Sequence, residues 1–206
     1  MLLNFEKLIT KYHLNIQGVI HIGAHYGEEY ELYNHCGIDK QLWFEPLESN
    51  FNVLKNMIGN INDIILEKYA LGNENKEMQM YVETVNRSQS SSLLKPKIHL
   101  TQYPMIKFDK TENVQMTRLD DYLQDKDYDY NFINIDVQGY ELEVFKGAEK
   151  TLQNIDYIIS EINRAELYEN CVQSYELDIF LGQFGFRRVE TDFVGGTWGD
   201  AFYIKR

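Results

Sequence analysis

The sequence is poor in several residue types, and each shortage excludes a class of protein. Only 2 of the 206 residues are cysteines, Cys36 and Cys171, and they form no C-x-x-C motif, so we expect reduced packing residues rather than a disulfide or a metal clip. The 3 prolines and 13 glycines gather into no linker, which predicts a single domain over residues 1–206. No apolar run approaches the roughly 18 residues of a transmembrane helix, and the first residues lack the basic-then-apolar order of a signal peptide. We therefore expect a cytoplasmic protein without a membrane partner.

Basic residues are also in the minority. Lysine and arginine number 20 against 32 aspartates and glutamates, which gives a net charge of −12. A chain of this charge repels phosphate backbones, and no dense basic cluster makes a local exception, so nucleic acid is not an expected partner. With 44% hydrophobic and 25% charged residues, the composition is that of an ordinary globular protein. The oligomeric state stays open, a homo-oligomer included.

Short apolar runs alternate with amphipathic ones along the chain, which is typical of βαβ units. A leading helix is predicted within residues 1–15, over 3–15. Further helices are predicted at 28–36, 49–58, 119–124, 140 to about 153, and 175–184. Strands are predicted at 18–22, 41–44, 61–69, 77–84, 114–117, 132–135, 157–162, 186–191 and 198–204, the last two as an antiparallel pair. Periodicity fails over 86–110, which predicts a lid or substrate loop.

The stretch from Asn131 to Gly147, N-F-I-N-I-D-V-Q-G-Y-E-L-E-V-F-K-G, combines a strand, an acid, a glycine turn and a helix. Its first half has the β-branched and aromatic content of a buried strand, and Asp136 stands where that run stops. Open α/β sheets bind ligands in the crevice beyond their strand ends. Asp136 is therefore expected at a ligand site.

A second candidate ligand site is the turn Gly23-Ala-His-Tyr-Gly27, which follows a strand and opens a helix. Glycines there let a cofactor approach the backbone, although the turn is not the G-x-G-x-x-G of an ordinary dinucleotide site. Some 20 residues on, Glu45 ends the next strand, where an acid can accept hydrogen bonds from ribose hydroxyls. A structural turn and a solvated strand end are the alternatives. Together the two features favour a nucleoside cofactor.

The arrangement of motifs resembles the FkbM family of S-adenosylmethionine-dependent methyltransferases over nearly the whole chain. The matching pieces are V-I-H-I-G-A-H-Y-G at 19–27, F-E-P at 44–46, A-L-G at 70–72, S-S-S-L at 90–93, T-R-L-D-D at 117–121, I-D-V-Q-G-Y-E-L-E-V-F-K-G-A at 135–148, S-E-I-N at 160–163 and W-G-D-A-F-Y at 198–203. The resemblance implies an α/β class I methyltransferase fold, Rossmann-like. Its seven-stranded mixed sheet would have the order 3-2-1-4-5-7-6, the last strand antiparallel, and helices on both faces.

The resemblance also implies a set of residues that bind S-adenosylmethionine. They are His21, Gly23, Ala24, His25, Gly27, Glu45, Ala70, Leu71 and Asp136. The glycine turn would lie beneath the methionine part, Glu45 would hold the ribose, and Ala70 with Leu71 would edge the adenine. Three positions depart from the family's usual residues: His21 stands for an acid, His25 for an asparagine and Asn134 for a lysine.

Family members of this kind methylate oxygen, often on sugars, so the resemblance implies a small-molecule or glycan acceptor. An alcohol is a poor nucleophile without a base. Asp136 is the first candidate for that base, followed by Glu161 and His25. Each has an alternative: Asp136 can cap the next helix or bind the cofactor's amine, Glu161 can be a buried acid paired with Arg164 or a neighbour, and His25 can simply tolerate an unusual backbone angle.

Six further residues are candidates for acceptor contacts: Ser90, Ser91, His99, Tyr103, Trp198 and Asp200. Solvated serines, and aromatic side chains that pin a loop to the core, are the alternatives. A divalent cation such as Mg²⁺ is left open, with Asp136, Glu161 and Asp200 as carboxylate ligands, but their spacing does not demand it and we assign no metal.

Two other classes of protein remain as alternatives. One is an NAD(P)-dependent oxidoreductase on a similar sheet, and the missing G-x-G-x-x-G argues against it. The other is a catalytically inactive methyltransferase-like binding module. A lost acid or a broken glycine turn would mark such a module, and the sequence has neither.

Overall fold

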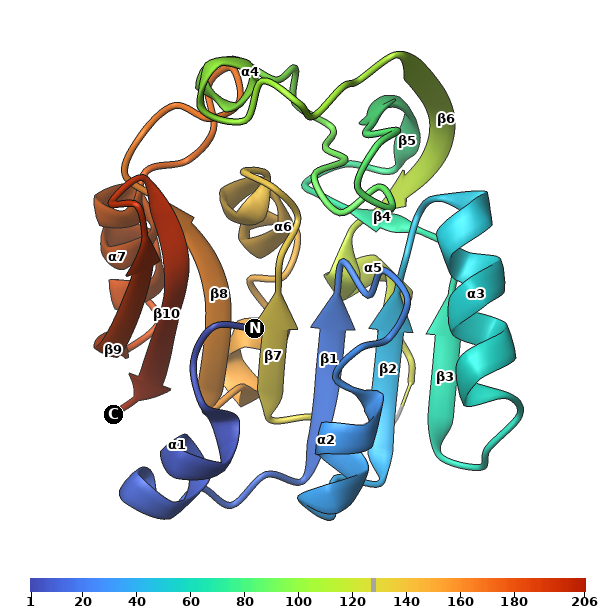
Figure 1. Cartoon of the computed structure of the whole chain (residues 1–206). Helices are drawn as coiled ribbons and strands as arrows, with labels where there is room; N and C mark the ends of the chain where they lie inside the picture. Colours follow the sequence, from blue (N-terminus) through green and yellow to red (C-terminus); the bar gives the residue numbers. More distant parts are fainter. Residues whose placement is uncertain (127–128) are drawn as a thin grey trace.

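The computed structural model describes residues 1–126 and 129–206, and a seven-stranded sheet runs through its centre (Figure 1). The strands are β1 (Gly18–Ile22), β2 (Lys40–Phe44), β3 (Ile64–Glu67), β7 (Phe132–Ile135), β8 (Tyr157–Asn163), β9 (Phe186–Val194) and β10 (Trp198–Lys205). Their order is β3-β2-β1-β7-β8-β10-β9, and β10 is antiparallel to both of its neighbours. This confirms the order and the antiparallel last strand that the resemblance implied.

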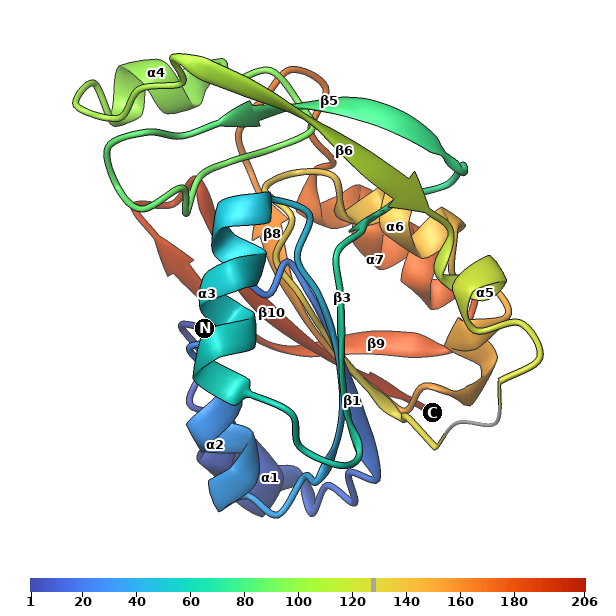
Figure 2. The ribbon, with the colours of Figure 1, turned by 90° about the vertical axis from the view of Figure 1, so that its right-hand side faces the viewer.

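Helices cover both faces of the sheet, as Figure 2 shows. One face carries α1 (Phe5–Tyr12), α2 (Tyr30–His35) and α3 (Glu48–Ile58), and the other carries α5 (Leu119–Tyr122), α6 (Glu141–Lys146), the 3₁₀ helix η1 (Thr151–Asn154) and α7 (Ser174–Gly182). Successive residues of β1 face opposite sides, so Val19 packs into one core and Ile20 into the other. Every residue of β1 and β7 is buried, which explains why these strands read as continuous apolar runs.

Local signals in the sequence set several helix ends. The Asn4 side chain accepts the Lys7 N–H and begins α1, and His13, in the left-handed region at φ 52°, ends it. At α7, Gln173 and Glu176 form a capping box. The caps of α1 stop that helix short of its predicted range, because each end residue satisfies backbone groups that the helix leaves open, whereas α7 begins one residue before its predicted start.

A second, three-stranded sheet was not anticipated. It consists of β4 (Ala70–Leu71), β5 (Lys76–Val82) and β6 (Lys110–Thr117), in the order β4-β6-β5. The strand predicted at 61–69 is shorter, because β3 ends at Glu67 and the chain turns away into β4. The strand predicted at 114–117 begins earlier, because β6 pairs with β5 along its whole length. This small sheet lies beyond the carboxyl ends of the central strands (Figures 1 and 2).

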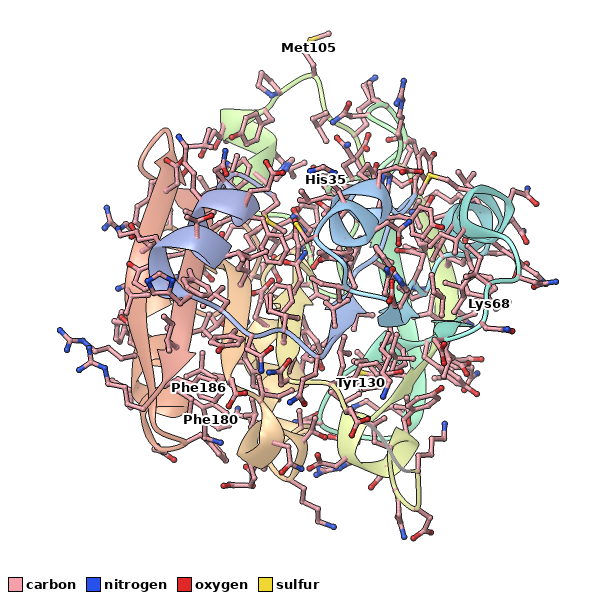
Figure 3. The ribbon with its side chains drawn as sticks, turned by 90° about the horizontal axis from the view of Figure 1, so that it is seen from below. His35, Lys68, Met105, Tyr130, Phe180 and Phe186 are labelled. Carbon is pink, nitrogen blue, oxygen red and sulfur yellow. The ribbon has the colours of Figure 1, made fainter. Side chains whose placement is uncertain are left out.

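The covering segment, residues 83–109, joins β5 to β6 and passes over the carboxyl ends of the central sheet (Figure 1). It contains the short helix α4 (Ile98–Gln102), which the prediction of an irregular segment missed. Met105 projects from it into solvent (Figure 3) and is 78% exposed. Among the described residues, no helix is both long enough and apolar enough to cross a membrane.

Candidate active site

A cavity of about 580 Å³ lies between the carboxyl ends of the central strands and the covering segment. Side chains from elements far apart in the sequence line it. The residues predicted as site residues that reach its wall are His21, Gly23, Ala24, His25, Glu45, Ala70, Leu71, Ser90, Ser91, His99, Tyr103, Asp136, Glu161, Trp198 and Asp200. Gly27 is the one member of the predicted set that does not line the cavity.

The glycine turn packs directly against the end of β7. Gly23 has a φ of +83°, and a Cβ there would lie 1.9 Å from the carbonyl oxygen of Asp136. Only glycine fits, and this close approach brings the turn and Asp136 to the same end of the cavity. Gly27 also has positive φ, but its missing Cβ makes room for Leu54, so it serves packing against α3.

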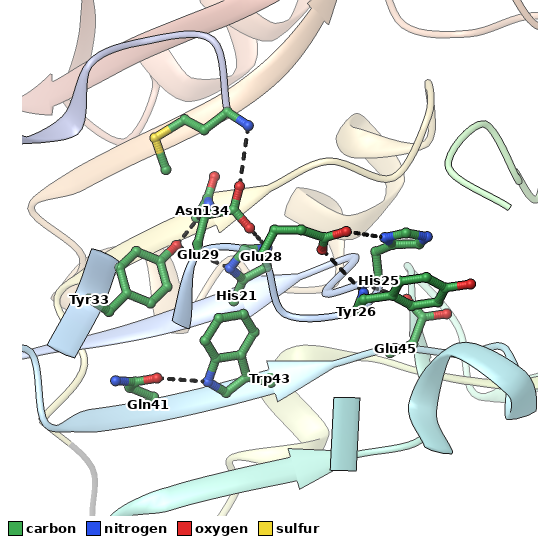
Figure 4. A network of polar contacts seen from close by, with 11 residues as sticks. His21, His25, Tyr26, Glu28, Glu29, Tyr33, Gln41, Trp43, Glu45 and Asn134 are labelled. Atoms are coloured by element: carbon green, nitrogen blue, oxygen red, sulfur yellow. Dashed lines mark hydrogen bonds and ion pairs between the residues drawn. The ribbon is translucent and has the colours of Figure 1, made fainter. Parts of the chain in front are cut away.

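Glu45 is a buried hydrogen-bond acceptor and not a solvated strand end. Its Oε2 accepts the His25 N–H at 2.8 Å (Figure 4). Its Oε1 accepts the Leu47 N–H at 2.9 Å. Burial raises the pKa of Glu45 to about 7, although the two backbone N–H groups oppose that shift. Each oxygen keeps acceptor capacity, and the residue lines the cavity.

His25 connects the glycine turn to the covering segment. Its Nδ1 lies 2.7 Å from Oε1 of Glu28 and its Nε2 lies 2.7 Å from the carbonyl oxygen of Arg87. Both partners accept, so both ring nitrogens donate. Burial opposes the charge, yet the Glu28 carboxylate and the Arg87 carbonyl raise the pKa of His25. The backbone of His25 has a φ of 48°, and its ring stacks on Tyr26 (Figure 4).

His21 belongs to a buried network on the face of β1 that packs against Tyr33 and Trp43. Its ring stacks on Trp43 with centroids 4.4 Å apart, and its Nδ1 lies 3.0 Å from the Tyr33 hydroxyl. The Tyr33 hydroxyl also accepts an N–H from Asn134 at 2.8 Å (Figure 4). Burial lowers the pKa of His21, although Glu29 opposes this. A neutral imidazole therefore stands where an acid is usual in the family.

Asp136 follows the last residue of β7 and faces the cavity. Its N–H donates to the Ile22 carbonyl at 3.0 Å, and its Oδ1 accepts an N–H from the Gln138 amide at 2.7 Å. The alternative that Asp136 caps α6 does not hold. The N-cap of that helix is Tyr140, with no side-chain cap bond.

Glu161 points from β8 into the same region and is 2% exposed. Its Oε2 accepts the second N–H of Gln138 at 2.6 Å, so one amide joins the Asp136 and Glu161 side chains. Burial raises the pKa of Glu161, and the nearby Asp136 and Glu141 charges add to the rise. Of the alternative pairings, the one with Arg164 does not hold, because that guanidinium lies 3.6 Å from the centre of the Phe193 ring, and the neighbour that bonds to Glu161 is Gln138.

Aromatic side chains hold the covering segment and also form part of the wall. His99 contacts the rings of Tyr103 and Tyr168, with centroids 5.0 and 5.5 Å away. Trp198 donates its indole N–H to the Tyr103 hydroxyl at 2.8 Å. These contacts support the alternative in which the aromatics pin the segment, and they still leave His99, Tyr103 and Trp198 facing the cavity.

The remaining predicted acceptor residues have backbone roles as well. The Ser91 hydroxyl accepts the Glu83 N–H at 3.0 Å, and the Ser90 carbonyl accepts from the Tyr168 hydroxyl at 2.8 Å. Asp200 accepts the Leu2 N–H at 2.5 Å, and burial raises the pKa of Asp200 to about 6.

Two residues of the site were not anticipated, Gln138 and Glu141. Gln138 has a φ of 53°, which aims its side chain back between two acids. The Oε1 of Glu141 accepts the N–H groups of Val137 at 3.2 Å and Gly139 at 3.0 Å, and this closes the turn after β7. The Q-G pair marks a turn, but no sequence signal shows that Glu141 folds back under it.

The family described as the methyltransferase FkbM domain matches residues 21–188 of this chain. The chain belongs to this family. The match confirms the resemblance seen in the sequence, and with the sheet order it identifies an S-adenosylmethionine-dependent methyltransferase of class I fold. The FkbM domain thus spans the glycine turn, both central acids and most of the cavity wall.

One curated relative is the 2-O-methyltransferase NoeI of Sinorhizobium fredii, 37% identical over 81 residues, which are 39% of this chain and 33% of that protein. The match thus spans about a third of the relative's length.

Solved structures share the fold at low identity. A putative S-adenosylmethionine-dependent methyltransferase from Listeria monocytogenes has a TM-score of 0.55 at 11% identity, covering 98% of both chains. The magnesium protoporphyrin IX methyltransferase of Synechocystis PCC 6803, with bound S-adenosylmethionine, has a TM-score of 0.54 at 9% identity, covering 98% of this chain and 76% of that one.

Proposed function

We propose that this FkbM methyltransferase transfers the methyl group of S-adenosylmethionine to a hydroxyl of a sugar or glycan-type acceptor. The observation that carries the proposal is that Asp136, the Gly23 turn and the Glu45 carboxylate line one cavity. The partial match to a 2-O-methyltransferase supports oxygen as the methylated atom.

The cavity has the features that the cofactor requires. Its volume of about 580 Å³ lies within the range of small-molecule sites. Glu45 is fixed by two backbone N–H groups and offers its remaining lone pairs to ribose hydroxyls, and the buried Ala70 and Leu71 provide an apolar edge for a base. When bound, S-adenosylmethionine supplies a methyl group already activated by its sulfonium.

The role of Asp136 is to accept a proton. An acceptor hydroxyl gives its proton to this carboxylate as its oxygen takes the methyl group, so the product ether carries no charge. The amide of Gln138 holds Oδ1 and fixes the orientation of the carboxylate, while the exposed side of Asp136 faces the cavity. His25 is less suited to this role, because hydrogen bonds occupy both of its ring nitrogens.

Thermal melting with S-adenosylhomocysteine, and with NAD as the comparison, tests the cofactor. At about 100 times its Kd a ligand adds roughly 2.7 kcal/mol, which for a chain of this length corresponds to a rise in Tm of about 5–10 °C. We expect that rise with S-adenosylhomocysteine and none with NAD. An unchanged melt at saturating S-adenosylhomocysteine would end the methyltransferase proposal.

Methyl transfer to a panel of methyl glycosides and oligosaccharides, followed by mass spectrometry, tests the acceptor and the base. Asp136→Asn is expected to keep its affinity for S-adenosylhomocysteine and to lose about 100-fold or more in kcat. Asp129→Asn is the matched control, since Asp129 is an exposed acid before the start of the same strand. Loss of cofactor affinity alone in Asp136→Asn would reassign this residue to binding.

A further inference from the structure

Three acidic side chains meet at the wall of the cavity: Asp136 and Glu161, which line it, and Glu141 behind them. One carboxylate oxygen from each lies within 4.8 Å of the other two. They come from three different places, the end of β7, the start of α6 and the middle of β8. The fold therefore assembles the group, and it is not a run of neighbouring acids in the sequence.

The group has little to balance its charge. In the parts of the chain that the structure describes, none of the three carboxylates pairs with a lysine, arginine or histidine. Among the described side chains, the neutral amide of Gln138 donates to both Asp136 and Glu161. Like charges at this separation repel strongly in a buried setting, so a positive ligand would stabilise the arrangement.

Within residues 1–126 and 129–206, two buried oxygens of the group have no hydrogen-bond partner, Oε2 of Glu141 and Oε1 of Glu161. The two residues are only 0% and 2% exposed, so these oxygens are also shielded from bulk water. A buried acceptor left without a partner destabilises the folded state, and more so when it is charged. Glu141 cannot rotate away freely, because its other oxygen holds the N–H groups of Val137 and Gly139.

We propose that Asp136, Glu141 and Glu161 form a binding site for a divalent cation such as Mg²⁺, Mn²⁺ or Ca²⁺. Carboxylate oxygens are the ligands that these hard cations prefer, and oxygens on opposite sides of an ion lie up to about 4 Å apart for Mg²⁺ and about 5 Å apart for Ca²⁺. The limit of 4.8 Å on the observed separations lies within the span for Ca²⁺ and is somewhat wider than the span for Mg²⁺. Asp136 borders the open cavity, which gives the ion a route of entry and room for water ligands.

This site is separate from the residues that would hold the cofactor's ribose and base, and it does not depend on the proposed methyl transfer. Its place beside Asp136 has one consequence for an acceptor that binds there. A cation lowers the pKa of a hydroxyl that it coordinates, and so it would assist the loss of the proton that Asp136 accepts.

Electron paramagnetic resonance of free Mn²⁺, titrated into the full chain after treatment with EDTA, tests the site. We expect a single strong site per chain, from which Mg²⁺ and Ca²⁺ displace Mn²⁺. Glu141→Gln and Glu161→Gln should each weaken Mn²⁺ binding about tenfold or more. Glu143→Gln, on the same helix but bonded to Lys146 and Asn73 at the surface, should change it less than about twofold.

Each outcome decides the question. The site is rejected if the wild-type chain binds no Mn²⁺, because the carboxylates then balance their charge by holding protons. It is also rejected if folded Glu161→Gln binds Mn²⁺ like Glu143→Gln, because the ion then sits elsewhere on an acidic surface. Near-ultraviolet circular dichroism checks folding, and Asp136→Asn replaces Glu141→Gln if the latter does not fold. A failure to bind S-adenosylhomocysteine would reject the methyltransferase proposal and leave this site standing.

Discussion

Replacing Glu45 by glutamine tests the cofactor site, because it exchanges one carboxylate oxygen for an NH₂ group and keeps the shape of the side chain. The two oxygens of Glu45 accept the backbone N–H groups of His25 and Leu47 at 2.8 and 2.9 Å. In Glu45→Gln one oxygen becomes an NH₂ group that must face one of these donors. A lost charge-assisted hydrogen bond and an unpaired buried N–H cost about 1.5–3 kcal/mol, so the free energy of unfolding should fall by that amount.

The same change should weaken cofactor binding. A neutral amide oxygen accepts hydrogen bonds from ribose hydroxyls less strongly than a carboxylate does. An NH₂ group that faces the His25 N–H would also displace that end of the glycine turn. A loss of about 1.4–2.8 kcal/mol corresponds to roughly 10- to 100-fold in Kd. Isothermal titration with S-adenosylhomocysteine, well below the Tm of both proteins, measures this directly.

Glu48→Gln is the matched control, because the side chain of this exposed residue, three positions further on, bonds to Lys68 and Asn52 at the surface. It should bind S-adenosylhomocysteine like the wild type. If folded Glu45→Gln also binds it within about twofold of the wild type, the carboxylate does not hold the ribose, and the assignment of the cofactor end of the cavity is wrong.

Three further outcomes are expected. Burial raises the pKa of Glu45 to about 7 in the folded apoprotein, so above the usual pKa of about 4.3 the folded state binds more protons than the unfolded state. The free energy of unfolding, measured by urea titration, should therefore fall by about 2 kcal/mol between pH 5.5 and 8. The fall should be smaller in Glu45→Gln. His25→Phe keeps the stacking on Tyr26 but loses the bond to the Arg87 carbonyl, so amide hydrogen exchange over residues 87–92 should be faster, by about tenfold for a loss of 1.4 kcal/mol. Gly23→Ala puts a Cβ 1.9 Å from the Asp136 carbonyl oxygen, and should lower the free energy of unfolding by more than about 3 kcal/mol or prevent folding, as circular dichroism will show.

The central sheet was predictable because its parallel strands are buried on both faces and so appear as short apolar runs between amphipathic helices. The second sheet was not. The β4 strand has only two residues, Ala70 and Leu71, and β6 alternates polar and apolar residues because one of its faces is exposed. A strand of two residues has no periodicity to detect, and its partner is found only when the chain has folded.

The positions of Glu161 and Glu141 could not be predicted from the sequence either. Period-two alternation predicts that Ile159, Glu161 and Asn163 share one face of β8, but not whether that face meets a helix or the cavity. Likewise the sequence places Glu141 in the first turn of a helix, where an exposed acid is common. Its burial depends on Gln138 and Gly139, whose positive φ angles turn the chain back over it.

The hydrogen bonds of Gln138 couple the proposed base to the covering segment, and this coupling exists only in three dimensions. The Nε2 of Gln138 donates to Asp136 and Glu161, and its Oε1 lies 2.7 Å from the Tyr168 hydroxyl. That hydroxyl also lies 2.8 Å from the Ser90 carbonyl, so its single proton is shared between the turn after β7 and the covering segment. The Tyr168 hydroxyl therefore links the amide that orients Asp136 to the backbone of the covering segment.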